Sequence, residues 1–296
     1  MLWLLLPLHF SGYAVDLRVL LVLSGNEAPY RTFATTFRQN LPADIHVSTQ
    51  EYADSFSDSG RQIDLIVTVG DQAAVSVIPH TGHPVLATML TSFRYAELAN
   101  NRQPGGELSA IFVDQPWDRQ VSLLRAALPS RNRIGILLSP GTDWKTEQLR
   151  RLLLDRGATL VTQVADSSGA LSGDLERVLS RSDLLLAIPD NTIYNSSNIR
   201  DIILSSYRHG IPLVGLSQSY VNAGALCAVF STLEQLAAQT GAAVIAYAKS
   251  GQLSGPQYPD SYSIAVNRQV ARSLGIELPS LEVIRNQMDK TKGGEP

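Results

Sequence analysis

The chain has 296 residues, of which 44% are hydrophobic and 17% are charged, so it has enough apolar material for one large domain or for two lobes. The formal net charge is -3 and no Lys/Arg run occurs, so we expect no nucleic-acid partner. The single cysteine, Cys227, excludes an intramolecular disulfide, and its apolar surroundings indicate a buried core residue.

The N-terminal segment is almost entirely apolar from Met1 to Phe10, and Ser11-Gly12-Tyr13-Ala14 follows it. An apolar run that ends in small residues is typical of a signal peptide, here residues 1–14. The run is about half of the roughly 20 residues that a membrane-spanning helix needs. We therefore expect export and a soluble mature protein in the periplasm. Because no Lys or Arg precedes Arg18, a hydrophobic extension of a cytosolic protein is the alternative.

Apolar strands and amphipathic helices alternate along the rest of the chain. The sequence predicts strands over 17–23, 45–47, 63–69, 84–90, 107–113, 133–138, 158–164, 183–188, 211–216 and 262–266. It predicts helices over 28–39, 73–78, 171–179, 196–209 and 267–274, and from Pro116, after Thr142 and after Ser231. The last of these has an S-x-x-E capping box, Ser231 with Glu234, and ends at Gly251. Such alternation predicts an α/β protein with parallel sheets flanked by helices, in two halves of similar size.

Polar turns follow several of these strands, and ligands of parallel sheets sit outside the carboxyl ends of the strands. We therefore expect the ligand-binding residues to be Gly70, Asp71, Gln72, Thr91, Ser92, Ser139, Trp144, Pro189, Asp190, Asn191, Ser217 and Gln218. Asp190 could accept hydrogen bonds from a ligand ammonium or cap the following helix. Trp144 could form an apolar lid or pack on the surface. The turn at Gly70 could equally be a capped helix with nothing bound.

No sequence motif predicts a catalytic residue, a metal site or a cofactor. Gly215 to Ser219 resembles a nucleophile elbow, but its last position is not glycine and no histidine follows it. His80 and His83 are separated by Gly82 in a predicted loop, with no nearby residue to complete a metal site. We therefore do not expect an enzyme.

The last third of the chain resembles a known family. It contains Leu-Leu-Leu-Ala-Ile-Pro-Asp-Asn-Thr from Leu184, His-Gly-Ile-Pro-Leu-Val-Gly from His209, and Ile264-Ala265-Val266-Asn267 near the end. This order resembles the ABC-transporter substrate-binding family whose better-known members take up aromatic amino acids. The first half fits the pattern more loosely. Thr91 and Ser92 depart from the polar turn that the family usually has there.

The resemblance implies a type I periplasmic binding protein fold, in which two Rossmann-like lobes joined by three crossovers hold a ligand between them. We expect an N-terminal lobe of residues 15–131 plus 222–253 and a C-terminal lobe of residues 132–221 plus 254–296. Carried over to matching positions, residues 70–72 would line the cleft from the first lobe and residues 189–191 from the second.

The function that this implies is capture of a small polar solute, with an amino-acid-like solute as one candidate, and its delivery to a membrane ABC permease. Hinge closure of the lobes over the solute is the expected mechanism, and a monomer is the expected state. One alternative is a periplasmic sensory subunit that reports the solute to a membrane kinase. The other is an α/β enzyme whose acid and base are dispersed along the chain.

Overall fold

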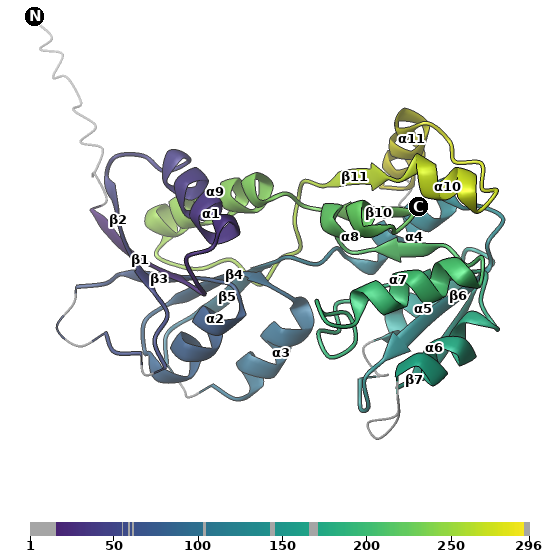
Figure 1. Ribbon diagram of the computed structural model, residues 1–296. Helices are drawn as coiled ribbons and strands as arrows, with labels where there is room; N and C mark the ends of the chain where they lie inside the picture. The colour runs from purple at the N-terminus through teal and green to yellow at the C-terminus, as the bar shows by residue number, and fades with distance from the viewer. Residues whose placement is uncertain are drawn as a thin grey trace, which may run out of the picture.

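The computed structural model describes residues 16–54, 56–58, 60, 62–102, 105–142, 146–165 and 171–292. The predicted signal peptide and Trp144 lie outside these residues. The described chain forms two lobes, each built around its own sheet, with chain segments passing between them (Figure 1).

The first lobe is built on a parallel sheet with the strand order β2-β1-β3-β4-β5. Its strands are β1 (Leu17–Leu23), β2 (Ile45–Glu51), β3 (Leu65–Val69), β4 (Val85–Leu90) and β5 (Leu108–Phe112). Its helices are α1 (Ala28–Gln39), α2 (Asp71–Val77), α3 (Ser92–Asn100) and α9 (Leu233–Ser250), with the short 3-10 helix η1 (Ile78–His80) after α2. Phe33 and Phe37 of α1 and Leu236 of α9 pack on one face, and α2 packs on the other. Because helices cover both faces, the inner strands are almost continuously apolar.

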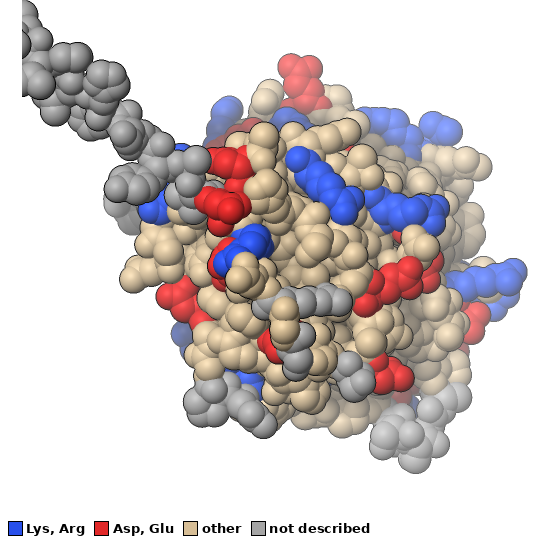
Figure 2. Space-filling model, turned by 90° about the vertical axis from the view of Figure 1, so that its left-hand side faces the viewer, with Lys and Arg blue, Asp and Glu red and all other residues tan. Residues whose placement is uncertain are grey.

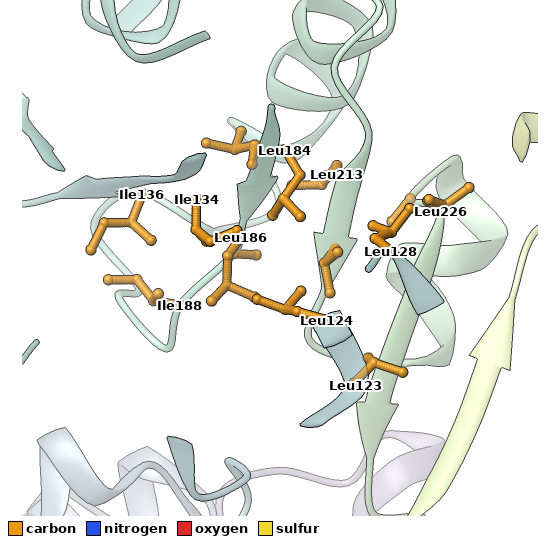
Figure 3. Close-up of a cluster of buried hydrophobic side chains, with 14 of the residues drawn as sticks. Leu123, Leu124, Leu128, Ile134, Ile136, Leu184, Leu186, Ile188, Leu213 and Leu226 are labelled. Atoms are coloured by element: carbon orange, nitrogen blue, oxygen red, sulfur yellow. The ribbon is translucent and has the colours of Figure 1, made fainter. Parts of the chain in front are cut away.

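The second lobe is built on a sheet with the order β11-β10-β9-β8-β6-β7, in which only β11 runs antiparallel to its neighbour. Its strands are β6 (Arg133–Leu138), β7 (Thr159–Val164), β8 (Leu184–Leu186), β9 (Leu213–Gly215), β10 (Cys227–Phe230) and β11 (Ser263–Val266). Its helices are α4 (Trp117–Ala127), α5 (Glu147–Leu154), α6 (Leu171–Leu179), α7 (Ile199–Arg208), α8 (Gln218–Ala223), α10 (Arg268–Ser273) and α11 (Leu281–Lys292). Figure 3 shows side chains of α4, β6 and β8 meeting in its core.

The two sheets repeat one strand order, since β2-β1-β3-β4-β5 corresponds to β7-β6-β8-β9-β10. The amino ends of the strands repeat an ion pair as well. Arg18 binds Asp64 before β3 at 2.9 Å, and Arg133 binds Asp183 before β8 at 2.8 Å. The hydrogen bonds from Arg18 lower the pKa of Asp64. At Asp183 desolvation opposes the charge, but hydrogen bonds from Arg133 and Asn132 outweigh it and lower the pKa.

The chain crosses between the lobes after β5, after β10 and before β11, and hydrogen bonds connect these three crossovers. Gln115 in the first crossover donates to the Ser231 hydroxyl in the second (3.0 Å), and that hydroxyl donates to the Ser261 carbonyl in the third (2.6 Å). The buried guanidinium of Arg119 donates to Gln115 and to the Pro259 carbonyl (2.5 and 2.8 Å). Hydrogen bonds therefore link all three crossovers to one another.

The sheets place some segments in a different lobe from the one that the sequence predicted. Helix α4 was assigned to the first lobe, but Leu123 and Leu124 fill the core of the second (Figure 3). Residues 222–230 were also assigned to the first lobe, whereas Cys227 pairs with Val214 of β9 in the second sheet. Residues 254–258 lie against the first lobe instead, because Gln257 bonds to the backbone of β5.

The start of α9 also differs from the prediction. Its capping box consists of Thr232 and Gln235, one residue beyond the predicted Ser231 and Glu234, because the Ser231 hydroxyl is bonded to the third crossover. The predicted end is correct: Gly251 closes the helix in the left-handed conformation, with φ 70°.

The outer face of the first lobe carries charges of both signs. Figure 2 shows Lys and Arg side chains scattered among Asp, Glu and uncharged residues on this face. In the part of the chain that the structure describes, no helix is both long enough and apolar enough to span a bilayer.

Candidate functional site

A cavity of about 240 Å³ lies between the lobes, at the carboxyl ends of strands from both sheets. The first lobe contributes residues that follow β3 and β4, and the second lobe contributes residues that follow β6 and β8. The lining residues are Asp71, Thr91, Phe93, Arg94, Glu97, Ser139, Thr142, Pro189, Asp190, Asn191 and Thr192. This is the location that parallel sheets favour for a ligand.

The first-lobe wall is built by the N-termini of two helices. Gly70 turns the chain from β3 into α2 with φ 92°, and a Cβ there would lie 2.6 Å from the Ser24 hydroxyl, so only glycine fits. Asp71 then begins α2 at the cavity. The Thr91 hydroxyl caps α3 by accepting from the Arg94 backbone N–H at 3.2 Å. Helix α3 lies on the side of the first lobe that faces the second (Figure 1).

Arg94 joins two carboxylates on this wall. Its Nε donates to Asp71 Oδ1 at 2.8 Å, and its Nη1 donates to Glu97 Oε2 at 3.0 Å. Partial burial disfavours the charged guanidinium, but the bonds to the two carboxylates outweigh it and raise the pKa of Arg94. The three side chains are between 35% and 49% exposed, so a solute in the cavity can reach them.

The second-lobe wall is organised around Asp190. Its Oδ2 accepts from the backbone N–H and the hydroxyl of Ser139, at 2.8 and 2.7 Å. Its Oδ1 accepts from the backbone N–H of Thr192 at 3.1 Å. Asp190 therefore caps a turn and joins the ends of β6 and β8, while α7 begins only at Ile199. The Thr142 hydroxyl donates to the Ser139 carbonyl at 2.7 Å and extends this wall.

An aromatic contact connects the lobes beside the cavity. Phe93 of α3 lies 6.2 Å from Trp117 of α4 between ring centroids, with the planes inclined by 53°. Phe93 lines the cavity and also packs against the core of the second lobe. A solute that moves Phe93 would therefore disturb an interlobe contact.

The structure brings about half of the predicted residues to the cavity: Asp71, Thr91, Ser139, Pro189, Asp190 and Asn191. Ser92 instead donates its N–H and hydroxyl to Asp114, at 2.7 and 2.6 Å. Ser217 caps α8, and Gln218 is exposed and bonded to Asn222. Gly70 and Gln72 also lie outside the lining, although Gly70 forms the turn that places Asp71.

The cavity also contains residues that were not predicted from the sequence: Phe93, Arg94 and Glu97 of the first lobe, and Thr142 and Thr192 of the second. Phe93, Arg94 and Glu97 lie on α3, which was not predicted because only Leu98 of this helix is buried. A signal was present: Thr91 is a favourable N-cap, and Ala96 to Ala99 consists of strong helix formers.

No group of three or more His, Cys, Asp or Glu side chains that could hold a metal ion occurs among the described residues. The His83 imidazole lies 3.5 Å from Asp58, and the Thr81 hydroxyl donates to the same carboxylate. The Cys227 thiol is buried, which raises its pKa to about 12 and disfavours the reactive thiolate.

The family model for ABC transporter substrate binding proteins matches residues 50–289. The chain belongs to this family. No curated protein matches its sequence. It is an ABC-transporter substrate-binding protein by family, and the solved structures that it resembles establish its fold.

One similar structure is an ABC domain in complex with L-Trp from Streptococcus pneumonia, with 20% identity and a TM-score of 0.63 over 91% of this chain and 98% of that chain. Another is the ligand-free, open structure of a substrate-binding protein with adhesive properties from Clostridium difficile, with 18% identity and a TM-score of 0.67 over 90% and 97%. A third is a periplasmic ribose ABC transporter protein from Conexibacter woesei, with 14% identity and a TM-score of 0.53 over 88% and 95%. The fold is that of type I periplasmic binding proteins, as the family resemblance implied.

Proposed function

We propose that this substrate-binding protein captures a small polar solute in the cavity between its lobes, outside the cytoplasmic membrane, and delivers it to a membrane permease. The observation that carries the proposal is the composition of the cavity wall. Both lobes contribute polar side chains from the carboxyl ends of their strands, so one solute can contact both lobes at once. A solute with contacts to both lobes favours the closed arrangement over the open one.

Binding is tested by isothermal titration calorimetry on the purified protein, with solutes first selected by thermal shift. We expect one solute per chain and a rise in melting temperature that grows with solute concentration. Asp71, Thr91, Ser139, Pro189, Asp190 and Asn191 are proposed contacts, so Asn191→Ala should weaken binding at least 10-fold. The exposed Asn222→Ala, outside the cavity, is the matched control. Equal losses in the two variants would contradict the site assignment.

Delivery and location are tested separately. Addition of the solute-loaded protein to its permease and ATPase in vesicles should stimulate ATP hydrolysis, and the solute-free protein should stimulate it less. Export predicts that the protein recovered from the periplasm begins at Val15. Recovery of the protein from the cytoplasm with Met1 in place would contradict export.

A further inference from the structure

We propose that the cavity selects solutes by a positive charge: an ammonium group of the solute binds Asp71, and a carboxylate on the solute is dispensable. This proposal rests on the proposed solute-binding function and names its ligand class. That class is small polar amines, such as amino alcohols, amino sugars and diamines.

The first observation is the charge of the wall. Among the described lining residues, three carboxylates (Asp71, Glu97 and Asp190) stand against one guanidinium, Arg94, a formal sum of -2. A cavity partly withdrawn from water strengthens interactions with such charges. The charges of these described residues therefore favour a cationic solute over an anionic one.

The second observation is the state of the guanidinium. Arg94 bonds to Asp71 and Glu97, both on its own lobe, and these contacts offset its charge. The guanidinium keeps Nη donors that have no partner among the described residues, but a solute carboxylate bound there would lie close to the carboxylates of Asp71 and Glu97. Repulsion between these like charges disfavours that arrangement. Arg94 is thus poorly prepared to receive an anion.

The third observation is the accessible oxygen of Asp71. Arg94 occupies Oδ1, while Oδ2 accepts no hydrogen bond from any described residue, and the side chain is 41% exposed. An ammonium group can therefore bind Oδ2 without breaking the Asp71–Arg94 ion pair. A charge-assisted hydrogen bond of this kind is among the stronger polar contacts.

Asp190 on the opposite wall contributes its charge rather than a direct hydrogen bond to the ammonium, because its oxygens already accept three hydrogen bonds from Ser139 and Thr192. Its neighbours Thr142, Asn191 and Thr192 supply neutral donors and acceptors. The second lobe therefore suits the hydroxyl or amide groups of a solute, while the first lobe suits its ammonium.

The test begins with a thermal-shift panel of amines, carboxylates, amino acids and neutral sugars. Calorimetry then compares three probes on each of two carbon skeletons. The probes are L-serine, ethanolamine and N-acetyl-L-serine, and L-tryptophan, tryptamine and N-acetyl-L-tryptophan. On the skeleton that fits the cavity, we expect the amine to bind at least as tightly as the amino acid. The N-acetylated acid should bind at least 10-fold more weakly than the amino acid. Tight binding of the N-acetylated acid, or of sugars alone, would overturn the charge preference and leave solute capture standing. Absence of binding by the entire panel would contradict solute capture and the charge preference together.

Two variants assign the charge to a residue. Asp71→Asn should weaken amine binding at least 10-fold, whereas Asp44→Asn makes the same charge change on an exposed loop away from the cavity and should leave binding unchanged. Arg94→Gln should keep or tighten amine binding because it removes the opposing charge. Loss of binding in Arg94→Gln with retention in Asp71→Asn would mean that the guanidinium receives an anion, which overturns the proposal.

Discussion

Phe93 of the first lobe packs on Trp117 of the second, with their ring centroids 6.2 Å apart. The contact lies beside the cavity and next to the first crossover, because Trp117 begins α4 directly after Pro116. It makes Trp117 an internal reporter of how the lobes are arranged.

Phe93→Ala should shift the fluorescence of Trp117 to longer wavelength, because the indole loses its apolar cover across the lobes. The measurement uses a background in which Trp3 and Trp144 are replaced by Phe, so that Trp117 is the only tryptophan. Tyr52→Ala, at an exposed aromatic residue of the first lobe, is the control and should leave the emission unchanged. An unshifted spectrum in Phe93→Ala would show that the rings are not in contact in solution.

Asp190→Ala should reduce the free energy of unfolding by about 2–3 kcal/mol, because buried donors of Ser139 and a backbone N–H of Thr192 lose their acceptor. Ser139→Ala removes only the hydroxyl bond, so it should cost about 1 kcal/mol. Urea unfolding measures both, and the exposed Asp44→Ala should stay within about 0.5 kcal/mol of the wild type. If Asp190→Ala were as stable as Asp44→Ala, the turn would not depend on this carboxylate.

Asp114 should make stability fall as pH rises. Desolvation raises the pKa of its carboxyl above the ordinary value, although two hydrogen bonds from Ser92 oppose the shift. The folded state therefore favours the neutral acid. The stability that the neutral Asp114 carboxyl contributes is fully present below about pH 4 and is lost as pH rises through the pKa of the folded state. The stability of the wild type relative to Asp114→Asn should decline over that interval, by at most about 1.4 kcal/mol per pH unit.

The Asp114 measurement compares the urea unfolding of the two proteins at a series of pH values, so that all other titrating groups cancel. If the free energy of unfolding of the wild type instead rose with pH relative to that of Asp114→Asn, the hydrogen bonds from Ser92 would dominate and the pKa of Asp114 would be lowered.

The continuous apolar strands could be predicted from the sequence, because strands buried on both faces need no polar positions. The site could be predicted only where a strand ends in a polar turn, as at Asp71, Ser139 and Asp190. Arg94 and Glu97 were missed, because the weak apolar face of α3 leaves only its N-cap and its helix-forming residues as signals in the sequence.

The C-terminal helix shows the same difficulty. Helix α11 was not predicted, since the helices predicted from the sequence end at residue 274. It packs on α4 through Ile284 and Met288 while Leu281 and Val283 remain exposed, so its apolar pattern is diluted. The predicted lobe boundaries were wrong for a related reason. The apolar periodicity of the sequence identifies α4 as a helix but does not indicate which sheet the helix covers.

The buried Arg119 should restrain the crossovers. Arg119→Met removes the bonds to Gln115 and to the Pro259 carbonyl, so amide hydrogen exchange in residues 260–262 should accelerate about 10-fold. Arg272→Met, on the exposed side of α10, is the matched control. Unchanged exchange in Arg119→Met would show that the crossovers hold together without this guanidinium.

Small-angle X-ray scattering of the purified protein, with and without a solute found by calorimetry, tests most directly whether two lobes close on a ligand. We expect the radius of gyration to fall on saturation and to stay at the solute-free value in Asp71→Asn at the same solute concentration. A radius of gyration that does not change while calorimetry shows full occupancy would contradict closure of the two lobes.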